Sequence, residues 1–191
     1  MLHLAMFFGV VALLLAYLTI LYNGLVGLKH SVAKCWANID VLLKQRHDEL
    51  PKLVEVCKHY AQFEQATLIG IMDARNAIAS HASQHRVEQL GAAETTLRGL
   101  LGQVFAVAEA YPELKADQQF SHLSQRITQL EESIADRREL YNDAVNLNNV
   151  RIDQFPDVLV ARLFGFEAAR PLRFSAEEKR DVDVGALFNA R

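Results

Sequence analysis

The first segment of the chain is an unbroken run of apolar residues. Leu4 to Tyr22 reads LAMFFGVVALLLAYLTILY, Thr19 is its only aliphatic polar side chain, and no Lys, Arg, Asp or Glu occurs before Lys29. As a helix, this run would extend about 28 Å, which is close to the thickness of about 30 Å of a bilayer's hydrocarbon core. Because a helix satisfies its own backbone hydrogen bonds, it can cross that core alone. The pattern predicts an uncleaved transmembrane anchor over residues 1–24.

Two other interpretations of this segment stay open, a cleaved signal peptide and a buried helix of a soluble protein. A signal peptide usually begins with positive charge and ends at a small-residue cleavage site. Here only Met-Leu-His precedes the run, and Tyr22-Asn23-Gly24 leads directly into another apolar pattern, so the anchor is favoured. Lys29 and Lys34 follow the anchor, and nothing basic except the amino terminus precedes it. The positive-inside rule therefore predicts that the rest of the chain is cytoplasmic.

From Leu25 onward, apolar residues recur at steps of three and four, the spacing of helices that pack along one seam as in a coiled coil. Arg46 interrupts this stripe, and Pro51 is expected either to kink the helix or to start a new one. A third helix is expected over Val87–Ala110. The expected seam positions of the first, second and last segments are Leu25, Leu28, Val32, Cys35, Ile39 and Leu42; Leu53, Cys57, Tyr60, Glu64, Thr67, Ile71, Ala74 and Ile78; and Phe120, Leu123, Ile127, Leu130, Ile134, Arg137, Tyr141, Ala144 and Asn148.

Short polar or proline-containing segments separate these helices. Residues 81–86 (HASQHR) form an expected connection, Tyr111-Pro112 closes the third helix, Asp117 is expected to cap the next one, and Phe155-Pro156 ends it. No β-alternation of useful length occurs before the tail. Long helices with short connections pack as an antiparallel bundle. We therefore predict an all-α fold, in which the anchor is followed by a helical-bundle domain over residues 25–156.

The tail, residues 157–191, is mixed in character. Its apolar segment VLVARLFGF is expected to dock on the bundle or to lie at the membrane surface, whereas Glu177–Asp183 is charged and Val182–Val184 is expected to be extended. The stretch from Phe155 to Phe166 is apolar beyond the bundle seam, which makes it the candidate interaction surface. Its members are Phe155, Leu159, Phe164 and Phe166.

Composition argues against several classes of protein. The 191 residues contain 20 Lys and Arg against 23 Asp and Glu, a formal net charge of −3, which argues against nucleic-acid binding. Cys35 and Cys57 are too few for a disulfide framework and form no CxxC pair, which argues against a cysteine-based zinc site. Because both lie on the inner seam, buried structural thiols are favoured over a nucleophile. No P-loop, dinucleotide fingerprint, GxSxG elbow or calcium loop is present, which lowers the odds of an enzyme. Four aromatic residues are expected to be core or interface anchors rather than a base-stacking platform: Tyr22, Trp36, Tyr60 and Tyr141.

Three charged residues map to the expected seams. Glu64 and Arg75 are eleven residues apart and return to the same helical face, and Arg137 lies on the inner seam of the last helix. Because a buried charge needs a partner, these three predict a structural polar network. The functional alternative is a carboxylate that acts as a general acid or base in a cleft, and structural pairing is favoured over it.

A second alternative is a metal site. His81, His85 and Glu88 could place three ligands on one helical face, a set that zinc would accept. The segment is nevertheless polar, with no second histidine cluster and no HExxH motif, so a solvated surface is favoured. We therefore expect no catalytic, cofactor or metal site.

The order of these motifs resembles the LemA family over most of the chain, from Tyr22 to Phe174. Two departures from the family pattern are Gly70 in mid-helix and Cys35 at a position that is usually small. The segments that carry the resemblance are Tyr22–Val26, Trp36–Arg46, Leu50–Glu55, Tyr60 with Glu64, Ala74-Arg75, Tyr111–Ala116, Phe120 with Leu123, Ile134–Arg137, Tyr141-Asn142, Phe155-Pro156 and Ala161–Phe166.

The resemblance implies a single-pass protein of the bacterial inner membrane with a helical-bundle domain. A relative at the magnetosome membrane implies a role in membrane organisation, and an HtpX-like membrane metalloprotease is implied as a partner. Together with the anchor, this favours a non-enzymatic, homo-oligomeric or partner-binding scaffold that contacts lipid and binds no nucleic acid. The alternative is an enzyme or metal-binding protein that uses Glu64, Arg75 and Arg137, or His81 and His85.

Overall fold

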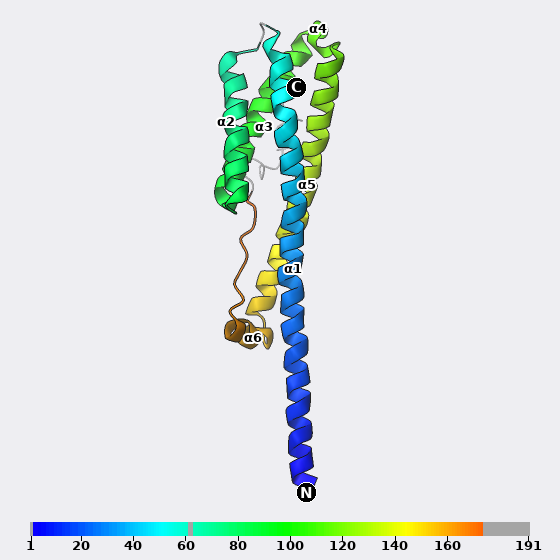
Figure 1. Ribbon diagram of the computed structural model, residues 1–191, viewed down its shortest axis with the longest axis vertical. Helices are drawn as coiled ribbons and strands as arrows, with labels where there is room; N and C mark the ends of the chain where they lie inside the picture. Colours follow the sequence, from blue (N-terminus) through cyan, green and yellow to red (C-terminus); the bar gives the residue numbers. More distant parts are fainter. Residues whose placement is uncertain (1, 61–62, 174–191) are drawn as a thin grey trace, which may run out of the picture. The chain divides into compact units, whose positions relative to one another are not determined.

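The chain folds into six helices, as the computed structural model shows for residues 2–60 and 63–173 (Figure 1). Within these ranges there is no strand, which confirms the predicted all-α class. The predictions for Glu177–Asp183 and Val182–Val184 lie outside the described residues. The helices are α1 (Leu2–Lys58), α2 (Gln65–Ser83), α3 (Val87–Ala110), α4 (Pro112–Lys115), α5 (Gln118–Asp153) and α6 (Asp157–Phe164).

The chain divides into two compact units, each assembled from separate stretches of sequence. Unit 1 comprises residues 1–39 and 136–171, and unit 2 comprises residues 40–135 and 172–191. Helices α1 and α5 therefore contribute residues to both units. Of the two outcomes expected at Pro51, the start of a new helix does not occur, because α1 continues through this proline to Lys58.

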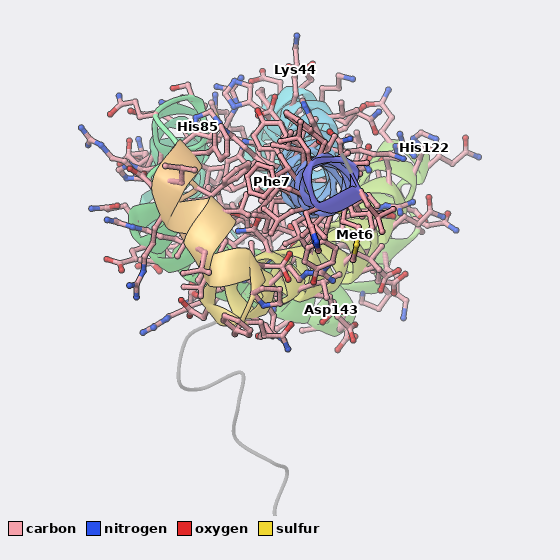
Figure 2. All side chains as sticks on the ribbon, turned by 90° about the horizontal axis from the view of Figure 1, so that it is seen from below. Met6, Phe7, Lys44, His85, His122 and Asp143 are labelled. Atoms are coloured by element: carbon pink, nitrogen blue, oxygen red, sulfur yellow. The ribbon has the colours of Figure 1, made fainter. Side chains whose placement is uncertain are left out.

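Unit 1 contains a long helical segment with no covering side chains. Every residue from Leu2 to Ile20 is exposed, and burial begins at Leu21. Figure 2, which looks along α1 from its amino-terminal end, shows Met6 and Phe7 projecting from different sides of the helix. Among the described residues, α1 is the one helix long and apolar enough to cross a membrane. This segment coincides with the predicted anchor.

The core of unit 1 starts where this exposed segment ends. Its buried residues come from α1, α5 and α6, and Phe166 packs against them from outside the cluster. Helix α6 ends at Gly165, which adopts a left-handed backbone with φ of 68° that glycine tolerates because it lacks a Cβ atom. The N–H of Phe166 then donates to the carbonyl of Ala161 at 2.9 Å. The cluster consists of Leu21, Leu25, Ile152, Val160 and Ala161.

The segment after α6 is fastened to α5. The side chain of Asn149 donates to the carbonyl of Ala169 at 2.9 Å and accepts from its N–H at 2.9 Å. The hydroxyl of Tyr141 donates to the carbonyl of Arg170 at 2.9 Å. Ala169 and Arg170 therefore dock on α5 through backbone atoms, so these hydrogen bonds need no particular side chain at either position.

Unit 2 is a helical bundle. Parts of α1 and α5 run beside the hairpin of α2 and α3 (Figure 1). Helix α3 has the predicted bounds, whereas α2 continues through His81 to Ser83, so the connection is shorter than expected. Asp117 caps α5 as predicted, because its carboxylate accepts from the N–H groups of Gln119 and Phe120.

Candidate interaction surface and buried ion network

The predicted interaction surface is largely exposed. Phe155, Leu159 and Phe164 have exposed fractions of 80%, 59% and 59%. Leu163, which the prediction did not include, is 78% exposed. We call Phe155, Leu159, Leu163 and Phe164 the α6 surface. Phe166 differs, because it is half-buried against the core cluster and serves packing.

The α6 surface continues onto α1. The ring centroids of Tyr22 and Phe164 are 4.8 Å apart, and those of Tyr22 and Phe166 are 5.8 Å apart. Residues of both helices line a shallow groove of about 390 Å³. The groove is almost wholly apolar, since Thr19 is its one aliphatic polar member and its hydroxyl donates to the carbonyl of Leu15 at 2.8 Å. The lining residues are Leu15, Leu18, Thr19, Tyr22, Leu159, Val160, Leu163 and Phe164.

Charged groups lie next to this apolar region. Asp157 at the start of α6 is buried, and its Oδ1 lies 3.0 Å from Nε of Arg151. Arg162 on α6 is exposed. A second cavity of about 350 Å³ has a mixed lining, in which Lys29, Asn148 and Glu167 lie beside Val32, Phe166 and Ala169. Charged side chains therefore first line a cavity of α1 about two helical turns after Tyr22.

The structure does not bury the predicted polar network. Glu64 is exposed immediately before α2, and its side chain makes no capping hydrogen bond. Arg75 is half-buried and donates from Nε to the carbonyl of His47 at 2.7 Å and from Nη1 to Oδ1 of Asn76 at 3.2 Å. Arg137 is exposed. The predicted burial of Glu64 and Arg137 is therefore wrong.

The physical reason is the phase of the helices. The seam of α5 runs through Ile134, Arg138 and Tyr141, which are buried, so the inner position is occupied by Arg138 rather than Arg137. Helix α1 ends at Lys58 and α2 begins at Gln65. Because the chain leaves the helix between them, a seam extrapolated through Glu64 loses its register.

The buried ion network of unit 2 is formed by other residues. The guanidinium of Arg46 binds the carboxylate of Glu94 through two nitrogens, with Nη1 donating to Oε2 at 3.0 Å, and Nη1 also donates to Glu131. Arg46 is 1% exposed and Glu94 is 5% exposed. Nε of the half-exposed Arg98 lies 3.7 Å from Oε2 of Glu131, which brings the network to two cations and two anions. The network joins α1, α3 and α5.

The electrostatics of Arg46 suit a structural role. Burial alone would lower the pKa of its guanidinium, but Glu94 and Glu131 more than offset this effect and the pKa lies above its ordinary value. A permanently charged arginine that holds two carboxylates leaves neither of them as a free acid or base. The sequence carries a signal for this network, because Arg46 and Glu94 stand at seam positions, Arg46 between Leu43 and Leu50 and Glu94 between Leu90 and Leu97. The expected seam treats Arg46 as an interruption of the stripe and does not include Glu94.

The cysteines and histidines of the described ranges take part in no cluster that could hold a metal ion. Cys57 is buried, as predicted, and Cys35 is half-buried. Burial raises the pKa of the Cys57 thiol to about 12, which opposes nucleophilic character. No three His, Cys, Asp or Glu residues gather to hold a metal ion in residues 2–60 and 63–173. His81 lies in the last turn of α2, and His85 lies after the helix with a positive φ of 52°.

A larger groove occurs in unit 2, between the end of α1 and α2. It has a volume of about 560 Å³, and Val54, Phe63 and Leu68 form part of its apolar lining. Glu55, Lys58 and Asp73 are charged members of the same lining. An apolar floor with a charged rim is the usual anatomy of a protein-binding patch.

Over residues 2–60 and 63–173, these features define an all-helical, membrane-associated protein with one candidate spanning helix. The chain belongs to the LemA family, whose profile matches residues 35–185. It is similar to magnetosome proteins MamQ 1 and MamQ 2 of Paramagnetospirillum magneticum, each 23% identical over 178 residues. It is also similar to magnetosome protein MamQ of Magnetospirillum gryphiswaldense, 25% identical over 180 residues. These matches cover 81% of this chain, which spans 65% of the length of the first two relatives and 66% of the third.

Proposed function

We propose that this protein is a membrane-anchored, non-enzymatic scaffold that holds a helical partner-binding domain beside the bacterial inner membrane. The observation that carries the proposal is the abrupt start of burial along α1. Every residue from Leu2 to Ile20 is exposed, and Leu21 is the first buried one. An apolar helix surface uncovered on all sides is unfavourable in water by about 25 cal/mol per Å² of apolar area, and lipid removes that cost.

The charges of the folded core support a scaffold rather than a catalyst. The buried carboxylates of the described residues, Glu94 and Asp157, each face an arginine, Arg46 and Arg151 respectively. Such pairs hold helices together and leave no acid or base poised for reaction. The apolar groove of unit 2 supports the partner-binding part of the proposal.

Attachment to a membrane would promote binding of this domain to other membrane proteins. Confinement to two dimensions raises its effective concentration toward other membrane proteins, without any new contact. We propose a second copy of the chain as the first partner, and the membrane metalloprotease implied by the family resemblance as the second. Lys29 and Lys34 support a cytoplasmic position for the domain.

The anchor is tested by charges placed in its middle. The full chain should remain in the membrane fraction of a bacterial host after extraction with alkaline carbonate. Leu13→Lys with Leu14→Lys should move much of the chain to the soluble or aggregated fraction, since each lysine costs about 3 kcal/mol at the centre of a spanning helix. The matched control is Leu140→Lys with Leu147→Lys, which changes two exposed leucines of α5. Equal extraction of both double variants would refute the anchor.

The scaffold part is tested by purification in a mild detergent. Native mass measurement of the extracted chain should show more than one copy, or one copy with a co-purifying membrane protein. A strictly monomeric chain without a partner would refute the scaffold, even if the anchor is correct.

A further inference from the structure

We propose that α6 is a second membrane-contacting element, an interfacial helix whose α6 surface lies among the lipid acyl chains beside the spanning helix. The inference rests on the anchor of the proposed function. It goes further by assigning lipid as the occupant of the exposed apolar surface formed by Phe155, Leu159, Leu163 and Phe164.

The position of α6 along α1 supports this assignment. Leu15 to Tyr22 of α1 line the same groove as the α6 residues, and they form the last part of the predicted lipid-crossing run, Leu4–Tyr22. Seven helical steps correspond to about 10 Å along the axis. The apolar face of α6 therefore stands beside the outermost 10 Å or so of the span. Amphipathic helices that lie on membranes bury their apolar face about 5–10 Å into the headgroup and acyl boundary.

The continuity of the two surfaces favours lipid over a protein partner. Tyr22 stands between the span and α6, with its ring 4.8 Å from that of Phe164, so no polar belt separates the two apolar regions. The exposed fractions of Leu159 and Leu163 are comparable with that of Leu13 in the span, at 59%, 78% and 74%. Lipid acyl chains that surround the last turns of the span would therefore also contact the α6 surface, with no belt of polar side chains to cross in between.

The charges around α6 fit the headgroup region. Arg162 and Lys29 are exposed, and long basic side chains extend toward lipid phosphates. Tyr22 is an aromatic residue of the type enriched at the membrane–water boundary. The acidic residue that opens α6, Asp157, is buried and paired with Arg151, so its charge is not presented to the anionic surface.

The test measures contact between position 163 and lipid in the full chain. Trp36 is the one tryptophan, and Trp36→Phe keeps an aromatic ring beside Tyr141 while removing its fluorescence. In this background three variants each carry one tryptophan at an exposed leucine: Leu163→Trp in α6, Leu13→Trp in the span, and Leu140→Trp in α5. Each is reconstituted in vesicles of phosphatidylcholine and phosphatidylglycerol, with either ordinary or brominated acyl chains.

If α6 lies in the membrane, Leu163→Trp loses a fraction of its fluorescence comparable with that lost by Leu13→Trp, and it is quenched best by bromine near the headgroup end of the chain. Leu140→Trp, 48% exposed on α5, should lose little. Quenching of Leu163→Trp no greater than that of Leu140→Trp, while Leu13→Trp is quenched, would overturn the inference and leave the anchor intact. In that case a second copy or another protein covers α6. Absence of quenching in Leu13→Trp would instead overturn the anchor itself.

A second measurement guards against a local change of structure in the tryptophan variant. Leu159→Gln with Leu163→Gln alters two side chains that are exposed in unit 1, so the helix content by circular dichroism in detergent should stay unchanged. In vesicles, the same pair should increase hydrogen exchange of the α6 amides, because the helix loses its lipid cover. Unchanged exchange in vesicles would count against membrane contact.

Discussion

The side chain of Asp117 caps the first turn of α5 and also binds the Tyr60 hydroxyl. Its Oδ1 accepts from the N–H groups of Gln119 and Phe120 at 2.8 and 2.9 Å, and its Oδ2 accepts from the Tyr60 hydroxyl at 2.7 Å. Asp117→Ala should lower the free energy of unfolding by about 1 kcal/mol, because the first turn of α5 loses its cap. Urea unfolding followed by circular dichroism measures this. Asp117→Asn, which keeps an accepting oxygen, should lose less, and equal loss in both variants would contradict the cap.

The same cap should depend on pH. Hydrogen bonds from the Phe120 N–H and the Tyr60 hydroxyl lower the pKa of Asp117 below its ordinary value. A group with a lowered folded-state pKa stabilises the fold above its unfolded pKa of about 4, and the effect disappears as the pH falls through the lower folded value. The stability difference between the unmodified chain and Asp117→Asn should therefore shrink below about pH 4. A difference that stays constant down to pH 2 would contradict this assignment.

The two cysteines should differ in reactivity. Burial raises the pKa of Cys57 to about 12, so roughly one molecule in ten thousand carries the thiolate at pH 8. In a Cys35→Ser variant, the remaining Cys57 should react with Ellman's reagent only after denaturation. A Cys57→Ala variant, which keeps the half-buried Cys35, should react in the native state. Fast native labelling of Cys57 would show that its environment opens.

At the scale of single residues, local chemistry and the burial of many apolar seam positions were predictable, whereas the burial of charged residues was not. The cap at Asp117 follows from its position before an apolar periodic run. The assignments of Glu64 and Arg137 failed because each depended on the phase of a helix over many residues, and a helix end or a one-residue shift of the seam moves a side chain by 100°. The partner of a buried charge, such as Glu94 for Arg46, lies 48 positions away in the chain.

Three helices of unit 2 are joined by the Arg46 network. Arg46→Met should destabilise this unit by about 3–5 kcal/mol, because Glu94 stays buried and Glu131 half-buried without their shared cation. The measurement is the denaturant midpoint of the full chain in detergent. Arg98→Ala, the half-exposed member, should cost at most about 1 kcal/mol. If Arg46→Met and Arg98→Ala lowered the stability by similar amounts, the buried position of Arg46 would not account for the stability that the network contributes.

The glycines of α3 provide a matched series. A Cβ atom at Gly91 would lie 2.7 Å from the carbonyl oxygen of Arg173, whereas positions 99 and 102 have nothing within 4 Å. Gly99→Ala and Gly102→Ala should each stabilise the chain by up to about 1 kcal/mol through helix propensity. Gly91→Ala should not be stabilising, because the added methyl group would displace the backbone at Arg173, and it should increase hydrogen exchange around Leu172. Equal stabilisation by all three variants would show that the backbone at Arg173 moves away from position 91 at little cost.

At the scale of helices, periodicity and breakers determined most of the fold. The bounds of α3 agree with the prediction, since polar residues precede it and Tyr111-Pro112 follows it. The extent of α2 was missed because His81 and its neighbours are polar, yet a helix that packs on one side tolerates polar residues on the other. The sequence pattern does not identify the helix over residues 157–164, because an eight-residue apolar stretch is too short to show a helical period.

The sidedness of the whole molecule should follow its two juxtamembrane lysines. A fluorescent protein that matures only in the cytoplasm, fused after Arg191, should fluoresce, and an alkaline phosphatase fused there should be inactive. Lys29→Gln with Lys34→Gln should weaken this preference, since basic residues within about 15–20 residues of the span set orientation. Lys44→Gln with Lys52→Gln, farther from the span, should not. An active phosphatase on the unmodified chain would place the domain outside.

The end of the apolar run, Leu4–Tyr22, and the start of the folded core share residues. Leu21 is 6% exposed in the core cluster of unit 1, and Tyr22 contacts the rings of Phe164 and Phe166. Cleavage by a peptidase after Gly24 would leave both residues on the amino-terminal fragment, separated from the rest of the chain. The remaining fragment would lack Leu21, one of the buried residues of the unit 1 core cluster, and the ring that packs on Phe164 and Phe166. Release by such a cut would therefore weaken the packing of unit 1 as it frees the chain.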